Sequence, residues 1–349
     1  MATTTSYRCE LLDKDEAPKG TLTGVTGGSL SYSVASTIKS QGNLRITYLP
    51  ATVDLLNDRV KVIITVNGED HALGVFKMVV PETGYTTSGN EWDVELLDKL
   101  AILDEVSIPG IYTLPADTNI IAKVKELIEA AGETAVAITE SDATLRGNVT
   151  WEEGTSRLRI INDLLEAANY FSLWCDGEGR YQATPHTDAQ YRPLTHQFVD
   201  GANCRYSPTF TRSQDIWKIP NRFIAISRAS EDEPAIIGIA TNENPESKFS
   251  FQARGRWIDE VSSDVELADQ AAADAYAARR LQDVSSAVAT VTISHEWTPL
   301  LLNDAVRFAR LRVPERHRID ARHVVQRMEV SLESAAFLTS TTLREVVSV

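Results

Sequence analysis

The clearest structural signals in the chain lie in residues 151–185, WEEGTSRLRIINDLLEAANYFSLWCDGEGRYQATP. Thr155 or Ser156 can cap a helix there, because a hydroxyl oxygen accepts a hydrogen bond from an unpaired N–H of the first helical turn. The apolar residues that follow recur every three or four positions, as on one face of a helix: Leu158, Ile161, Leu164, Leu165 and Ala168. This half of the stretch predicts an amphipathic helix.

The second half of the stretch has the pattern of a β-hairpin. Phe171, Leu173 and Cys175 alternate with Ser172 and Trp174, a turn follows at Asp176–Gly179, and residues 181–184 form the returning strand. Gly177 and Gly179 are expected to supply positive φ angles in the turn. No catalytic motif is present, so the stretch predicts a compact unit of one helix and one hairpin.

Composition limits the classes of protein to which the chain can belong. A chain of 349 residues is too long to fold around one ordinary hydrophobic core, so two or three domains are predicted. With 43% hydrophobic and 24% charged residues, the profile is that of a folded globular protein. The net charge of −15 disfavours broad binding to nucleic-acid phosphates, which requires a cationic surface.

The N-terminal residues MATTTSYRCE have neither the basic nor the apolar region of a signal peptide. The longest apolar runs have the length of a strand, so we expect no membrane insertion by this chain. Cys9, Cys175 and Cys204 have no metal-ligand or disulfide spacing, which favours a protein made in a reducing cytosol. Cys9 and Cys175 lie in strand-like runs and are expected to be small buried hydrophobes.

Residues 1 to about 104 show the alternation of antiparallel β-strands. The run Val60–Val66 leads into Asn67-Gly68, a strong signal for a two-residue hairpin turn, and residues 71–80 provide the returning strand. The glycine-rich run 24–28 lacks the lysine and the following helix of a phosphate-binding loop. Nucleotide binding is therefore not expected there.

The prolines Pro109 and Pro115 suggest a boundary. A helix is predicted from Asp117 or Thr118 to Gly132, followed by a strand at Thr134–Thr139, so residues 105–188 read as a small α/β unit.

Beyond residue 188 the pattern returns to β. Ser263-Asp264-Val265-Glu266 has the spacing of a capping box and predicts an alanine-rich helix to about Gln282. The predicted strands are 198–206, 217–227, 235–241, 288–293, 305–311, 324–332 and 342–349.

Candidate chemical groups are few. Glu152 and Glu153 precede a predicted helix, where negative charge suits the helix dipole, and they are weak candidates for an acid/base pair. The segment 186–188 (His-Thr-Asp) and His295 lack the context of a catalytic triad or a zinc site. We therefore expect no enzyme activity, no catalytic residues, no cofactor and no metal.

A basic cluster stands out in this acidic chain. We predict that its arginines contact a neighbouring protein, since guanidinium groups pair with carboxylates in bidentate fashion: Arg310, Arg312, Arg316, Arg318 and Arg322. Two alternatives are a solvated charged loop and a metal site made of His317, Asp320 and His323, whose mixed spacing argues against it.

Four successive blocks together resemble the minor tail proteins of long-tailed phages of actinobacteria. That group is similar to the tail-hub or baseplate-hub family, which includes the late-control protein D type. The blocks are residues 7–30 (YRCELLDKDEAPKGTLTGVTGGSL), 59–81 (RVKVIITVNGEDHALGVFKMVVP), 91–106 (EWDVELLDKLAILDEV) and 151–185.

The resemblance implies an α+β, mainly β fold with two antiparallel β-barrel domains similar to the tail-tube subunit. It places the first at 1–104, a small α/β domain at 105–188, the second at 189–230 with 285–349, and a helix-containing insertion at 231–284. The segment PLLLNDAVRF resembles a strand pattern of the second barrel, with Asn303 where the family has a glycine.

The resemblance further implies a structural minor tail protein of a siphophage, a homotrimer at the tail tip that lets DNA pass. Its implied partners are copies of itself, the distal tail protein, the tape measure protein and other tip proteins in the virion, after synthesis in the host cytoplasm. The alternatives are a glycan-binding or glycan-hydrolysing tip protein, and the hub of a secretion-system spike.

Overall fold

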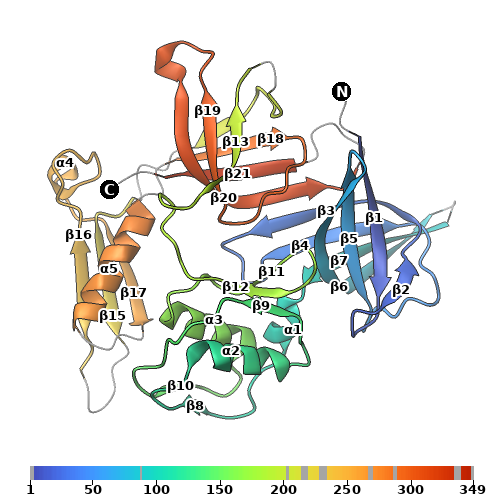
Figure 1. The fold of residues 1–349 in the computed structure, drawn as a ribbon, viewed down its shortest axis with the longest axis horizontal. Coiled ribbons are helices and arrows are strands. Elements are labelled where there is room, and N and C mark those ends of the chain that lie inside the picture. The colour runs from blue at the N-terminus through green and yellow to red at the C-terminus, as the bar shows by residue number, and fades with distance from the viewer. Residues whose placement is uncertain are drawn as a thin grey trace.

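The computed structural model describes residues 4–86, 89–201, 204–213, 219–227, 234–265, 270–285, 289–333 and 339–346. It is mainly β with few helices, so the α+β, mainly β class is confirmed. Figure 1 shows the N-terminal strands on the right, helices α1 to α3 below, the C-terminal strands at the top and the segment around α5 on the left. No helix among the described residues is both long and apolar enough to cross a membrane.

The N-terminal strands form an antiparallel array in the order β3-β4-β7-β6-β5-β1-β2. Their alternating residues bury one face, with Leu30, Val62 and Val94 fully enclosed. Asn67 and Gly68 have φ angles of 52° and 88°, which confirms the predicted hairpin turn. The strands are β1 (Thr5–Leu12), β2 (Pro18–Thr21), β3 (Val25–Ser33), β4 (Ser40–Ile46), β5 (Arg59–Val66), β6 (Glu69–Thr86) and β7 (Gly89–Asp98).

The α/β unit contains helix α3 (Arg157–Ala167), where it was predicted. The Ser156 hydroxyl accepts from the Arg159 amide at 3.2 Å, and the predicted leucines and isoleucine of its apolar face are buried. Helix α2 (Ile120–Glu129) is capped by Asn119 instead of Asp117 or Thr118. Asp117 has a φ of 64°, a left-handed conformation outside the helix. The other elements are α1 (Leu100–Glu105), β8 (Tyr112–Leu114), β9 (Val136–Ile138), β10 (Val149–Trp151), β11 (Trp174–Cys175) and β12 (Tyr181–Ala183).

The predicted hairpin of residues 171–184 forms as β11 and β12, and β12 also pairs in parallel with β9. The role predicted for one of its glycines was wrong. Gly179 has a φ of +78°, but Gly177 does not have a positive φ angle. Gly177 is required for a different reason: a Cβ there would lie 2.1 Å from the carbonyl oxygen of Ala72 on β6. The turn therefore packs against the N-terminal sheet.

The C-terminal strands continue the same sheet. The 13-residue strand β20 pairs along one edge with β21, and along the other edge first with β19 and then with β3. One strand thus joins the N-terminal and C-terminal β regions. The elements are β13 (Leu194–Val199), β14 (Thr211–Ser213), β18 (Thr290–His295), β19 (Ala305–Arg310), the 3₁₀ helix η1 (Glu315–His317), β20 (Ile319–Ser331) and β21 (Thr339–Glu345).

The sheet order β14-β18-β21-β20-β3-β4-β7-β6-β5-β1-β2 has two ends within the described residues. The layout of two tube-like barrels therefore remains a prediction, as do the domain boundaries. Asn303 has a φ of 68°, a conformation that favours glycine and that asparagine tolerates. This explains how asparagine can stand where the resembling family has glycine.

The segment on the left of Figure 1 is a small sheet with helix α5 on one face. Its strands are β15 (Arg222–Ser227), β16 (Ile237–Thr241) and β17 (Asp259–Val265), with helices α4 (Phe251–Arg254) and α5 (Gln270–Ser285). The predicted capping box was wrong, because Ser263 lies in β17, which pairs in parallel with β15. Its fourth residue, Glu266, and the start of the predicted strand at 217 lie outside the described residues.

Candidate protein interface

The predicted arginine cluster lies at the end of the β19–β20 hairpin, at the top of Figure 1. Asp200, which follows β13, fixes the turn after β19. Its two carboxylate oxygens accept from the amides of Leu311 and Arg312 at 2.9 and 2.8 Å. Burial opposes ionisation of Asp200, but these amides outweigh it, so the pKa of Asp200 lies below its ordinary value. The hairpin end is thereby held against β13.

Arg310, Arg316 and Arg318 line a common hollow of about 520 Å³, which we call the arginine hollow. The Arg310 guanidinium lies 5.3 Å from the centre of the Phe210 ring, a cation–π arrangement. Arg316 Nε donates to Nε2 of His317 at 3.0 Å. The other residues that line the hollow are Pro208, Thr209, Arg212 and Ile319.

Sequence reasoning missed Arg212 and Phe210. They come from the segment around β14, about a hundred residues before the cluster, and only the sheet topology brings them to the hairpin. Arg212 Nη2 pairs with Glu345 Oε2 at 3.0 Å. No periodicity or motif in the sequence indicates this contact.

Two of the predicted arginines do not line the arginine hollow. The Arg312 side chain lies beside Gly201, where an added Cβ would be 3.2 Å from its guanidinium. Arg322 points its Nη1 toward the main chain of the segment before β13 and donates to the carbonyl oxygens of Ala189 and Arg192. Neither is among the residues that line the arginine hollow.

The weak candidates for chemistry are dispersed. Asp320 is exposed and pairs with Arg307 at 2.8 Å, whereas His323 is buried beside the Phe308 ring. Glu152 and Glu153 are both exposed. Across the described ranges, no three His, Cys, Asp or Glu side chains are grouped as metal ligands.

The buried His295 has both ring nitrogens in hydrogen bonds. Nδ1 lies 2.6 Å from the carbonyl oxygen of Glu296, and Nε2 lies 2.8 Å from the Thr341 hydroxyl. Burial lowers the pKa of His295 to about 4, so the ring is neutral near pH 7. Cys9 is buried, which raises the pKa of its thiol to about 12, while Cys175 and Cys204 are partly buried. His295 and the three cysteines are therefore best described as side chains packed into the protein interior.

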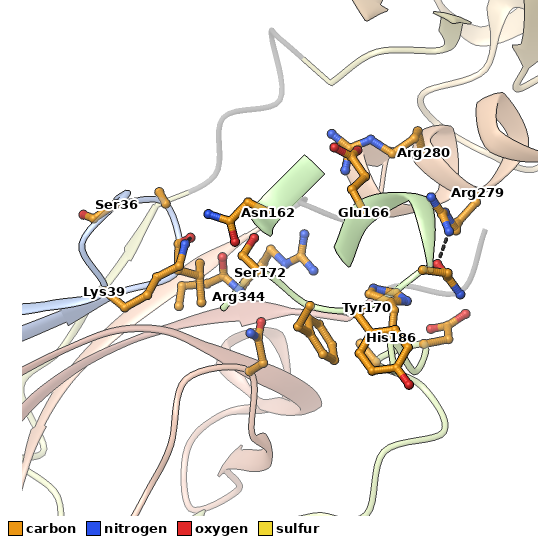
Figure 2. Close-up of a pocket in the computed structure, with 18 of the residues that line it drawn as sticks. Ser36, Lys39, Asn162, Glu166, Tyr170, Ser172, His186, Arg279, Arg280 and Arg344 are labelled. Atoms are coloured by element: carbon orange, nitrogen blue, oxygen red, sulfur yellow. Dashed lines mark hydrogen bonds between the residues drawn. The ribbon is translucent and has the colours of Figure 1, made fainter. Parts of the chain in front are cut away.

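A polar cavity of about 710 Å³ lies at the centre of the molecule, where α3, α5 and the β3–β4 turn meet (Figure 2). Its wall contains charges of both signs, including Lys39, Glu166, Arg279 and Arg280. Polar contacts cross it from α5 to the α/β unit: Tyr276 Oη donates to Glu166 at 3.2 Å, and Arg279 donates to Asn169. The cavity is a polar junction between the α5 segment and the rest of the molecule.

The small sheet has one face covered by α5 and one face exposed. Phe223 and Ala225 pack against Ala277 and Leu281 on the covered face. On the other face Ile237, Ile239 and Val261 are about half exposed, at 49%, 53% and 55%. Exposed apolar patches of this kind often mark protein contacts.

The chain has the fold of solved phage tail proteins. It aligns with a tail protein from Neisseria meningitidis at a TM-score of 0.69 and 12% identity, covering 98% of this chain and 97% of that chain. A 43 kDa tail protein of a Shewanella oneidensis prophage aligns at 0.68 and 12% identity, with 97% and 98% covered. The prophage tail protein gp18 from Listeria monocytogenes aligns at 0.58 and 13% identity, with 97% and 94% covered.

An Escherichia coli component of the type VI secretion system, described as similar to the T4 tail proteins gp27 and gp5, aligns at a TM-score of 0.51 and 8% identity. The alignment covers 100% of this chain and 75% of that protein. No protein-family model and no curated protein sequence matches the chain. At these identities the likeness establishes the fold alone.

Proposed function

We propose that this chain is a structural tail-hub protein of a long-tailed phage and forms a homotrimeric ring at the tail tip. The observation that carries the proposal is the fold match to three tail proteins along nearly the whole length of both chains. Partial matches of single β domains would carry little weight, because many functions share such domains.

The proposed function includes a division of the chain into four parts. We assign residues 1–104 to one tube-like β domain, 105–188 to the α/β domain, 189–230 with 285–349 to the second β domain, and 231–284 to the insertion. The hydrophobic clusters follow this division only in part. Phe223 and Ala225 pack with Ala277 and Leu281 of the insertion, and Leu100 and Leu103 pack with the α/β domain. Two similar β domains in each of three chains would give six related positions around the ring.

The ring would connect the tail tube and the distal tail protein to other tip proteins, with the tape measure protein and then DNA in its channel. The net charge of −15 favours such a channel, because a surface that binds few phosphates would let DNA slide. We expect many of the surplus carboxylates to face the channel. A positively charged channel in an assembled ring would contradict this expectation.

The role is geometric and not enzymatic. The candidate acidic residues Glu152 and Glu153 are exposed and lie outside both cavities described above. Glycan hydrolysis requires two carboxyl groups that flank the substrate in a defined geometry. A zone of clearing on host cell wall, produced by the purified chain, would favour a hydrolase instead.

Electron microscopy tests the proposal directly. Virions of the phage that encodes the chain would be labelled with a gold-conjugated antibody against it, and we expect label at the tail tip only. Label along the whole tail, or its absence from virions, would contradict the hub role. Labelled secretion-system particles would instead favour the spike hub, an alternative that the E. coli likeness supports.

A further inference from the structure

The β6–β7 hairpin extends beyond the strands on either side of it. Strand β5 pairs with β6 only as far as Lys77, and β4 pairs with β7 only from Trp92 onward. Residues 82–86 and 89–93 continue to pair with each other, and we call these two segments the arm. Strand β4 still flanks Trp92 and Asp93, so residues 84–86 and 89–91 form the two-stranded end of the arm. In Figure 1 they lie at the far right of the molecule. A two-stranded ribbon is only marginally stable by itself, so the arm gains from a partner.

The arm is acidic and has an exposed aromatic side chain. Residues 82–93, ETGYTTSGNEWD, contain no lysine or arginine. Tyr85 is 81% exposed, and Glu82, Glu91 and Asp93 are exposed. Glu82 lies directly opposite Asp93 in the strand register, and like charges in this position destabilise a sheet. Arg45 of β4 lies opposite Asp93 on its other side, so Glu82 is the carboxylate that lacks a facing cation. Within the described part of the chain, no cation pairs with Glu82 or Glu91, so a cationic partner would relieve this repulsion.

The arginine hollow has the opposite character. No acidic side chain is among its lining residues, although the whole chain has 49 acidic and 34 basic residues. Arg316 and Arg318 are exposed, and within the described part of the chain they donate to His317 and to the Val313 carbonyl oxygen.

We propose that the arm of one copy of this chain docks into the arginine hollow of a neighbouring copy. Glu82 and Glu91, which share one face of the arm, pair with the guanidinium groups of the hollow. In Figure 1 the arm is at the right and the β19–β20 hairpin, which carries Arg310, Arg316 and Arg318, is at the top, so the contact forms between copies. It is a head-to-tail contact. Such contacts produce a closed ring when repeating the rotation from one copy to the next returns to the first copy. The inference rests on the proposed trimer and names its contact surfaces.

Charge exchange tests the contact. The arm variant is Glu82→Arg with Glu91→Arg, the hollow variant is Arg316→Glu with Arg318→Glu, and a third variant combines all four changes. Sedimentation velocity of the full chain is measured at low salt, on the order of 0.01 M, where exposed charges are weakly screened. We expect the first two variants to associate at least about tenfold more weakly than the wild type, and the combined variant to recover association.

Matched controls separate this contact from a general effect of charge. Glu152→Arg with Glu153→Arg changes the net charge as the arm variant does, and Arg146→Glu with Lys248→Glu matches the hollow variant. All four control residues are exposed and lie outside both surfaces. The controls are expected to associate like the wild type. Unchanged melting temperatures would verify that every variant is folded.

Three results would overturn the inference. The first is a trimer that forms equally well in the arm and hollow variants, which would leave the proposed function intact. The second is a combined variant that remains as weak as its parents. The third is a wild-type chain that stays monomeric even at about 0.1 mM, a concentration at which a contact strong enough to hold the ring would be formed. Antibody labelling of virions would still decide the proposed function separately.

Discussion

Lys99 and Glu133 form a buried ion pair that joins the N-terminal sheet to the α/β unit. Lys99 Nζ lies 2.7 Å from Glu133 Oε2, and their side chains are 1% and 5% exposed. Arg59 on β5 also binds Glu133, and both cations contact Glu16. The Tyr181 ring lies 5.0 Å from Lys99 Nζ, and its hydroxyl donates to the Lys99 carbonyl oxygen. The two cations and two carboxylates balance each other's charge.

Glu133→Gln is expected to destabilise the protein by about 3–5 kcal/mol, because it leaves buried cations without full compensation. Urea unfolding at pH 7 would measure the loss. The control Glu126→Gln removes an exposed partner of Lys123 on α2 and should cost about 0–1 kcal/mol. Equal losses in the two variants would show that the buried pair has no special role.

Gly177→Ala is expected to cost about 1–3 kcal/mol or more, because the new methyl group would overlap the Ala72 carbonyl oxygen. The thermal unfolding midpoint would report the change. Gly147→Ala provides the comparison, since a Cβ there meets nothing within 4 Å and its φ is not positive. A neutral Gly177→Ala would mean that the hairpin can move away from β6.

His295→Asn is expected to flatten the acid side of the stability curve. Burial lowers the pKa of His295 to about 4 from its ordinary 6.5. Between these values the unfolded chain binds the extra proton, so stability is lost as the pH falls. The loss through this residue is about 3 kcal/mol. Urea unfolding between pH 4 and 7 measures the slope, and an unchanged slope in the variant would refute the assignment.

Asp98→Asn should change the slope in the opposite direction. Burial raises the pKa of Asp98 to about 7, although the Ser40 and Leu100 amides favour its ionised form. Between pH 4 and 7 the folded chain holds the extra proton, so this residue makes stability fall as the pH rises. The variant should therefore gain stability with pH more steeply than the wild type. A flatter curve would contradict this.

The exposed face of the small sheet should tolerate polar residues. Ile237→Thr with Ile239→Thr is expected to change the free energy of unfolding by no more than about 0.5 kcal/mol, because both side chains are half exposed. Phe223→Ala on the covered face should cost about 3–5 kcal/mol. If the double variant is as unstable as Phe223→Ala, the exposed face takes part in the fold of the isolated chain.

Local sequence signals predicted the local structure well. Ser156 caps α3 because its hydroxyl needs only the amide three residues ahead, and Asn67-Gly68 forms its turn because both residues accept positive φ angles. The capping box at Ser263 failed because the same residues can also extend a strand. Pairing with β15, together with the Arg222–Asp259 ion pair at 2.6 Å, favours the strand.

The arginine cluster was predictable in part. Arg310, Arg316 and Arg318 are close in sequence, and one hairpin end holds all three. The contribution of Arg212 depends on the pairing of β14 with β18. The Arg322 guanidinium is held outside the hollow because it donates to the carbonyl oxygens of Ala189 and Arg192, which lie far from it in the sequence. The pairing of β20 with β3 joins residues about 300 positions apart, and no local pattern specifies its register.

The shared strand β20 also determines how the molecule would respond to force. A pull that separates its two β regions along the strand direction would load the row of main-chain hydrogen bonds between Arg327–Ser331 and Ser29–Ser33 in shear. Hydrogen bonds loaded in shear bear the force at the same time, so they must break together. Hydrogen bonds loaded one after another break singly and at a lower force. The α5 segment is held across the cavity by side-chain contacts and would yield first. A tail tip built from this chain would keep its two β regions coupled under tension, while its outer segment gives way.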